Sequence, residues 1–167
     1  LDTNDPKRGA GFNSIWCSPD KTPDKNVTIT GCHFSNLVRG IGTHLYSKGK
    51  YHDGITITNN TFTNCMSLYG ILNWTNTTIT GNTATNCTSN DKYRFMAFIA
   101  GASGLTIKNN AFTNCKADMI FRVYKSYSGS KGFEPTLSSL TEEEINGLEN
   151  NKFKNCAEPI YQVIAHT

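Results

Sequence analysis

The sequence predicts an all-β chain, wound as a single-stranded right-handed parallel β-helix (a solenoid) with loop insertions. Three observations predict this fold. A nine-residue pattern starts at residues 29, 57, 79, 107 and 148, so its copies lie 28, 22, 28 and 41 residues apart. Each copy runs from an aliphatic residue through an aromatic residue, or once alanine, to asparagine. Apolar residues alternate with threonine, as in a half-buried strand, and a period of this length indicates coils that bury their apolar faces against one another.

Equivalent positions of successive copies are expected to stack into columns, one strand spacing of about 4.8 Å apart. Two of these columns are apolar, and Ala84 is a small member that needs compensation from its neighbours. The aliphatic column consists of Ile29, Ile57, Ile79, Ile107 and Leu148. The aromatic column consists of Phe34, Phe62, Ala84, Phe112 and Phe153.

Two further columns are polar. Stacked asparagine side chains can hydrogen-bond along a column, and asparagine tolerates the left-handed backbone that a sharp corner requires. We expect the column of Asn36, Asn64, Asn86, Asn114 and Asn155 to lie in the interior. The second column consists of Asn60, Asn82, Asn110 and Asn151, with Cys32 as its first member.

Four cysteines share one position of the repeat, where the first coil has Leu37. A free cysteine behaves as a small hydrophobic residue, so we expect a buried stack rather than a metal site or a disulfide framework. If any two cysteines form a disulfide bond, we expect them to be Cys17 and Cys32. The stacked cysteines are Cys65, Cys87, Cys115 and Cys156.

The 167 residues are predicted to form a single domain with regular coils over about 26–165. The chain starts without methionine or a signal peptide, so we expect a fragment of a longer protein or a mature chain. A short helix is predicted near 141–146, because Thr141 and Glu144 have capping-box spacing. Insertions are predicted at 38–54, 88–104 and 125–147.

Charge and hydropathy exclude two classes of partner. The formal net charge is +3 and no lysine and arginine run is present, which argues against nucleic acid. No apolar stretch approaches the roughly 18 residues that a membrane span needs. The sequence gives no oligomeric state.

Chemically versatile residues are densest from Arg39 to Asp53. Arg39 and His44 lie on either side of two glycines, which allow close approach of a ligand to the backbone. His44 is a candidate catalytic residue, the alternative being a surface histidine at a strand end. Tyr51 and His52 are candidate substrate-binding residues.

Later coils carry cations and aromatic residues on the equivalent second strand, and these side chains would line one side of the stack. Aromatic faces pack on sugar rings, and arginine holds carboxylates with two parallel hydrogen bonds. The alternative is that Trp74 and Tyr124 cover the core. Arg122 points outward only if Phe121 and Val123 point inward. The candidates are Asn73, Trp74, Arg122, Tyr124 and Lys125.

The acidic residues on the regular coils are isolated, as at Asp53, Asp118 and Glu149. Hydrolysis of a glycosidic bond usually needs two close carboxylates. Proton abstraction beside a uronate carboxylate needs instead a base and a cation, which this inventory supplies better.

The coil pattern, as at Asn59–Cys65, resembles the right-handed β-helix repeats of the pectate-lyase-like superfamily over roughly residues 26–165. This superfamily includes polysaccharide lyases, glycoside hydrolases, uronan epimerases and phage tail-spike depolymerases. The stretch Arg39–His44 looks like a segment of bacterial and phage β-helix proteins. Neither the paired aspartates of polygalacturonases nor the Tyr-Gly-x-Asp-Pro-His motif of the epimerases is present.

The resemblance implies a protein that acts on an extracellular, acidic polysaccharide, with lyase-like β-elimination favoured. His44 or Tyr124 would be the base, while Arg39 and Arg122 would neutralise the uronate. The protein would be secreted, held at a cell surface or carried on a phage particle. Whether it is an enzyme stays open, since the alternative is a non-catalytic glycan-binding or structural module. No cofactor or metal site is indicated, and calcium is the one ion kept open.

Overall fold

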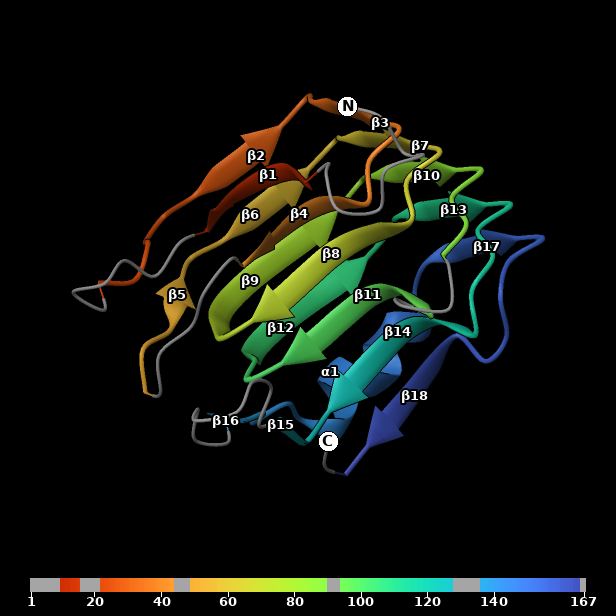
Figure 1. The fold of residues 1–167 in the computed structure, drawn as a ribbon. Coiled ribbons are helices and arrows are strands. Elements are labelled where there is room, and N and C mark those ends of the chain that lie inside the picture. The colour runs from red at the N-terminus through yellow and green to blue at the C-terminus, as the bar shows by residue number, and fades with distance from the viewer. Residues whose placement is uncertain (1–9, 16–21, 44–48, 90–93, 128–135, 166–167) are drawn as a thin grey trace.

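A computed structural model describes residues 22–43, 49–89, 94–127 and 136–165, together with the backbone of 10–15. The chain forms three parallel sheets whose strands stack coil upon coil (Figure 1). Sheet A has the order β1 (Ala10–Ile15), β4 (Arg39–Thr43), β8 (Ser67–Leu72), β11 (Phe95–Ala100), β14 (Met119–Tyr124) and β18 (Tyr161–Ile164). Sheet B has the order β12 (Ser103–Lys108), β9 (Trp74–Thr80), β6 (Thr56–Thr58) and β2 (Thr28–Thr30), with β5 (His52–Asp53) paired to β9. Sheet C has the order β17 (Lys152–Lys154), β13 (Ala111–Thr113), β10 (Thr83–Thr85), β7 (Thr61–Thr63) and β3 (His33–Ser35).

The chain visits the three sheets in a fixed cycle. It passes from β2 to β3 to β4 and from β6 to β7 to β8, and the coils from β9 and β12 repeat this order of sheets B, C and A. In the last coil the 3-10 helix η1 (Gly147–Glu149) stands where the strand of sheet B would be. This is the predicted all-β arrangement of parallel coils. Strands β4 and β11 lie inside two of the predicted insertions, so these segments are regular coil over part of their length.

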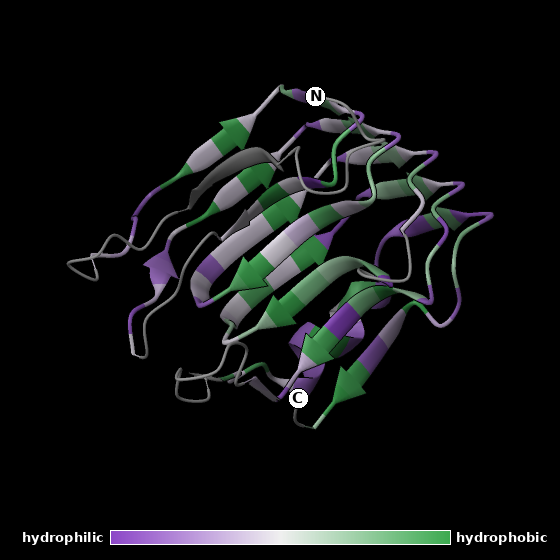
Figure 2. Ribbon diagram, in the orientation of Figure 1, coloured by the Kyte–Doolittle hydropathy of each residue, from purple (hydrophilic) through white to green (hydrophobic). Residues whose placement is uncertain are grey.

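The predicted apolar columns are confirmed, and Figure 2 shows hydrophobic positions of neighbouring strands lying side by side. Ile29, Ile57, Ile79 and Ile107 pair in register and are at most 5% exposed. Leu148 is buried too, but it lies in a 3-10 helix rather than a strand.

The aromatic column also keeps its register, and its rings stack where two aromatic residues are adjacent. The ring centroids are 5.0 Å apart for Phe34 and Phe62, and 5.2 Å for Phe112 and Phe153. Between the stacked pairs stands Ala84. Tyr69 packs edge-on against Phe62, at a centroid distance of 5.3 Å, and so fills the interior next to this smaller member.

The interior asparagine ladder runs through Asn60, Asn82 and Asn110, which are 1–3% exposed. The Nδ2 of Asn60 donates to Oδ1 of Asn82 at 3.0 Å, and that of Asn82 donates to Oδ1 of Asn110 at 2.9 Å. Each Oδ1 also accepts the backbone N–H of the preceding member. The ladder ends at Asn151 and starts from the N–H of Cys32. The buried corner is therefore satisfied by side-chain amides.

The other asparagine column is not interior, which corrects the prediction. Asn64 and Asn86 are exposed, and Asn114 is half-buried, although their amides still bond along the column, as from Asn64 to Asn36 at 2.9 Å. All five members have φ between 52° and 58°, so the left-handed corner is confirmed. Water can satisfy these side chains, so the ladder does not by itself require asparagine here. The left-handed backbone conformation is what selects it.

Cys156, the last member of the cysteine stack, is half-buried and not buried as predicted. Cys65, Cys87 and Cys115 are buried as predicted, at 0–1% exposure, and carry free thiols. Their Sγ atoms lie 3.5–3.9 Å from carbonyl oxygens of the preceding coil. Hydrogen bonding to Cys115, together with burial, raises the pKa of Cys87 to about 12. The Cys87 thiol therefore stays protonated and unreactive at neutral pH. Cys32 is exposed with a free thiol, and Cys17 lies outside the described residues.

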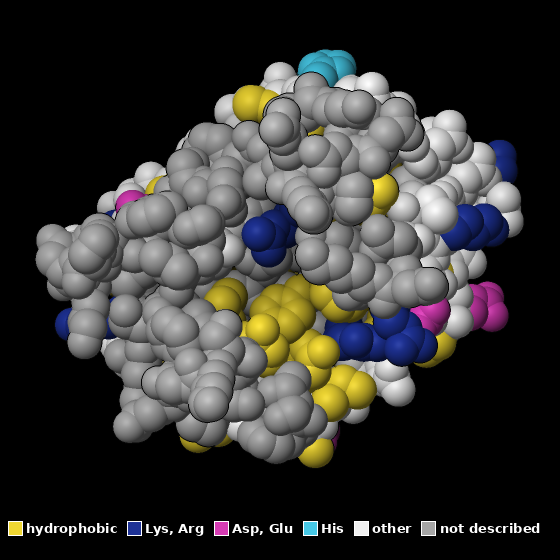
Figure 3. Space-filling view, viewed as in Figure 1, with side chains coloured by type: hydrophobic (Ala, Val, Ile, Leu, Met, Phe, Trp, Pro, Cys, Tyr) yellow, Lys and Arg dark blue, Asp and Glu magenta, His cyan; other side chains and the backbone are white. Residues whose placement is uncertain are grey.

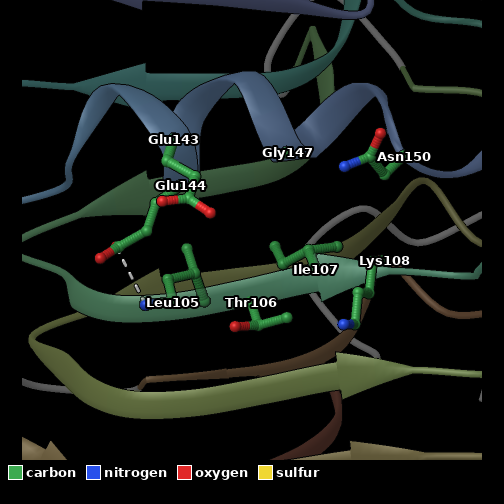
Figure 4. A pocket seen from close by; sticks show the side chains of 8 residues that line it. All are labelled: Leu105, Thr106, Ile107, Lys108, Glu143, Glu144, Gly147 and Asn150. Carbon is green, nitrogen blue, oxygen red and sulfur yellow. Dashed lines mark hydrogen bonds between the residues drawn. The ribbon is translucent and has the colours of Figure 1, made fainter.

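The predicted short helix is present as α1 (Glu142–Asn146), followed by the 3-10 helix η1 (Gly147–Glu149). The hydroxyl of Thr141 caps α1 by accepting the N–H of Glu144. Oε2 of Glu144 accepts the N–H of Leu105 at 3.1 Å, over a hollow of about 230 Å³ between α1 and β12 (Figure 4). The helix thus covers the edge of sheet B, which would otherwise be open to pairing.

Two smaller features complete the fold. Strands β15 (Ser126–Tyr127) and β16 (Thr136–Leu137) form an antiparallel pair beside the end of β14. No helix in the described part of the chain is long and apolar enough to cross a membrane.

Candidate functional site

Strand β11 of sheet A departs from strict alternation and brings two residues three apart onto the same outer face. In β11, the rings of Phe95 and Phe98 lie 5.9 Å apart. In β14, Nε of Arg122 lies 3.4 Å from Sδ of Met119. The burial patterns agree, because two buried residues stand between the half-buried Phe95 and Phe98. Phe95 and Phe98 therefore both point outward, which strict alternation would not allow.

Four aromatic rings gather on this face. Phe98 lies 5.1 Å from Tyr124 and 4.8 Å from Tyr127, and the two tyrosine rings are 5.4 Å apart. All are half-buried, as is Phe95. Figure 3 shows hydrophobic side chains over β11 and β14, with lysine and arginine side chains on two sides. We call Phe95, Phe98, Tyr124 and Tyr127 the aromatic cluster.

Arg122 borders the cluster on one side. Its guanidinium carbon lies 5.4 Å from the centre of the Phe95 ring, a cation–π contact. Phe121 and Val123 are buried at 0% and 1%, so Arg122 points outward, as the sequence analysis required. Its side chain is half-buried and held by the cluster rather than by a carboxylate.

Arg39 borders the cluster on the other side and lies over two glycines. A Cβ atom at Gly42 would be 3.1 Å from Cδ and Nε of Arg39, and one at Gly70 would be 2.9 Å from its Nη1. Gly70 is in register with Phe98, and Phe98 with Arg122. The Gly70 and Arg122 positions are thus two strand spacings apart, or roughly 10 Å.

Arg39 is half-buried, yet in the part of the chain that the structure describes it has no hydrogen-bond, carboxylate or ring partner. By contrast, Arg94 is paired with Asp118, with both Nε and Nη2 at 2.6 Å from the carboxylate. A guanidinium has five N–H donors and remains charged at any ordinary pH. Arg39 therefore offers a fixed positive charge to an anion.

Three predicted substrate-binding residues are buried in the core instead. Trp74 is 0% exposed, and its Nε1 donates to Oγ1 of Thr43 at 2.7 Å. Asn73 is 0% exposed, has a left-handed φ of 59° and donates to the carbonyl of Lys50. His52 is 1% exposed. These predictions are wrong, because the residues form the corner between sheets A and B and have no surface for a ligand.

His52 holds this corner to the segment before β2. Its Nδ1 accepts the N–H of Asp24 at 3.0 Å and lies 3.6 Å from the Asp24 carboxylate. Its backbone N–H donates to the carbonyl of Asn73 at 2.8 Å. Burial lowers the pKa of His52 below its ordinary value of 6.5, and the Asp24 carboxylate offsets part of this effect.

Acid is expected to destabilise the protein through His52. The unfolded chain binds this proton more tightly than the folded one, so the contribution is complete above pH 6.5 and is lost as the pH falls below it. Urea denaturation across this range would measure the loss. In His52→Asn, whose Oδ1 can still accept the Asp24 N–H, the free energy of unfolding should fall less steeply with acid. Equal slopes in the two proteins would contradict the assignment.

The remaining predicted residues are Tyr51, Lys125, Tyr124 and His44. Tyr51 is half-buried beside Thr75 and Leu137, in a hollow of about 240 Å³ on the sheet B side. Lys125 is exposed just after β14, while Tyr124 belongs to the aromatic cluster. His44 lies outside the described residues.

The described residues hold no group of three histidine, cysteine, aspartate or glutamate side chains placed to bind a metal ion. Glu143 and Glu144 line the hollow under α1, but Glu144 is engaged with the backbone of Leu105. Glu143 and Glu144 therefore do not form a free carboxylate pair of the kind that a glycosidase uses.

The structure brings Arg39, Arg122 and Tyr124 to one face and adds residues that sequence reasoning missed. Phe95 and Phe98 were hidden in a segment predicted as an insertion, and Tyr127 in another. The three-residue spacing of the outward positions in β11, Phe95 and Phe98, could have identified these two residues.

No curated protein and no solved structure matches the chain. A protein family described as "Right handed beta helix region" does match, over residues 14–165. The match covers nearly all described strands, including those that carry the outer face of sheet A. The chain therefore belongs to the right-handed β-helix family.

Proposed function

We propose that the outer face of sheet A binds an acidic polysaccharide outside the cell, on a rigid solenoid of the pectate-lyase-like kind. The observation that carries the proposal is Arg39, a half-buried guanidinium that has no acceptor among the described residues and lies next to the aromatic cluster. A carboxylate-bearing sugar supplies what this face lacks, because it accepts two parallel N–H donors and also presents an apolar ring face.

The order of groups along the face suits a chain of sugars. Arg39, Phe98 and Arg122 follow one another across neighbouring strands, so cation, aromatic ring and cation alternate. Aromatic faces pack on the C–H groups of sugar rings, and the flanking guanidinium groups bind their acids. A secreted, cell-surface or phage-borne protein would meet such polymers.

A lyase reaction is the second candidate, favoured because Tyr124 shares the face with both arginines. In that reaction a base, Tyr124 or His44, removes the proton beside the uronate carboxylate. The electron pair forms a carbon–carbon double bond, and the glycosidic oxygen leaves with its sugar. Arg39 or Arg122 would stabilise the negative charge that develops on the carboxylate.

Binding to a panel of uronic-acid polymers, measured by calorimetry with and without calcium, tests the proposal. Arg39→Ala is expected to weaken binding about 10- to 100-fold, since a charge-assisted hydrogen bond contributes roughly 1.5–3 kcal/mol. Lys152→Ala, an exposed charge on sheet C, makes the same change in net charge and should have little effect.

The result also separates the two candidates. Ultraviolet absorbance by an unsaturated product would establish a lyase, and its loss in Tyr124→Phe would assign the base. Binding without product would leave a glycan-binding module. A wild-type protein that binds no acidic polymer, or an Arg39→Ala variant that binds as well as wild type, would overturn the proposal.

A further inference from the structure

The two glycines under Arg39 are not explained by the backbone. Neither Gly42 nor Gly70 has a positive φ, and both lie in strands where other residues would fit the backbone conformation. Glycine weakens a strand interior and often marks a close approach by another group. Here the approaching group is known, since the nearest atoms to an added Cβ at either position all belong to Arg39.

We infer that Gly42 and Gly70 are positioning residues, which hold the Arg39 guanidinium flat against sheet A in the orientation that receives a carboxylate. The inference rests on the proposed binding of an acidic polysaccharide. The two glycines are paired in register, so together they form a floor two strands wide. Gly42 adjoins the stem and Nε of Arg39, and Gly70 adjoins Nη1.

The floor also explains how Arg39 keeps its position although the described part of the chain gives its guanidinium no acceptor. A long side chain on an open surface populates many rotamers, and ordering it on ligand binding costs free energy. Contact with two backbone segments removes part of this freedom before the ligand arrives. The N–H donors on the outer edge stay available for the carboxylate.

A methyl group at Gly70 should therefore lift Arg39 and leave the fold intact. The Cβ would lie 2.9 Å from Nη1, a flexible side-chain tip that can move, and its three nearest neighbours are all atoms of Arg39. Gly40 differs, since its Cβ would lie 2.6 Å from the buried Phe62 ring. Gly70→Ala consequently tests the position of the Arg39 side chain, whereas Gly40→Ala would test packing against the buried Phe62 ring.

The experiment compares four proteins: wild type, Gly70→Ala, Arg39→Ala and the double variant. Gly70→Ala is expected to weaken binding of the acidic polymer about 10-fold with an unchanged melting temperature. The double variant should bind no more weakly than Arg39→Ala, because the glycine acts only through the arginine. Gly147→Ala, in an open place on η1, is the matched control and should change nothing.

A second readout needs no ligand. The Nε–H of Arg39, assigned in NMR spectra with Arg39→Lys, should exchange with water several-fold faster in Gly70→Ala than in wild type. Unchanged exchange together with unchanged binding would overturn the inference while the proposed function stands. If the wild type bound no acidic polymer, the proposed function would fail, and the exchange rate alone would decide whether the glycines position Arg39.

Discussion

Asn82→Ala is expected to destabilise the protein by about 2 to 6 kcal/mol. Two buried main-chain groups would lose their hydrogen bonds to the Asn82 side chain, and each loss costs roughly 1–3 kcal/mol. The N–H of Asn60 donates to its Oδ1 at 3.0 Å, and the carbonyl of Ile57 accepts from its Nδ2 at 3.0 Å. No water can replace the side chain without entering the core, since Asn82 is 3% exposed. Urea denaturation at neutral pH measures the loss.

The outer column provides the matched control. Asn114 bonds its neighbours on both sides, at 3.1 Å and 2.8 Å, but water can reach this column. Asn114→Gly retains the positive φ of 53° without strain, so the cost should stay within about 1 kcal/mol. Similar losses in the two variants would mean that burial does not decide the strength of the ladders.

Trp74→Ala is expected to cost about 3–5 kcal/mol, as for other fully buried large aromatic residues. The indole fills the corner between sheets A and B at 0% exposure, and its N–H donates to Thr43. Binding of acidic polymers by the protein that remains folded should be unchanged, since the ring has no surface. Thermal and urea unfolding give the stability, and calorimetry gives the binding.

Trp74→Phe separates packing from hydrogen bonding. It keeps most of the apolar volume and removes the indole N–H, while Thr43 still donates to the carbonyl of Leu72 at 3.0 Å. The expected cost is therefore smaller, about 1–2 kcal/mol. Weaker glycan binding at unchanged stability would restore the original assignment of Trp74 to the ligand site.

Sequence reasoning reached the repeat and its columns because each column consists of like residues in register. Ile57 and Phe62 have the same partners in the structure as in the aligned copies. Sequence reasoning did not distinguish the inner asparagine column from the outer one. Asn82 and Asn86 are both polar, both stack and both stand at corners, and only the direction of the chain at each corner separates buried from exposed.

The candidate site was harder to predict, because sheet A does not follow strict alternation. In β11 the outward residues Phe95 and Phe98 stand three apart, so a search for period two does not place both of them on one face. Arg39 and Arg122 were chosen as candidates for their charge, which can be read from the sequence without knowing how the strands pair. The role of Gly70 depends on contact with a residue 31 positions earlier, and no local pattern carries that information.

The inner asparagine ladder has a direction. Every Nδ2 that bonds along it points toward the C-terminal coils, from Asn60 to Asn82, Asn110 and Asn151. Aligned amides polarise one another, by about 10–30% per bond, so a member with neighbours on both sides gains more than one at an end. The buried corner is thus a line of parallel dipoles, and the same substitution should cost more at its middle than at its ends.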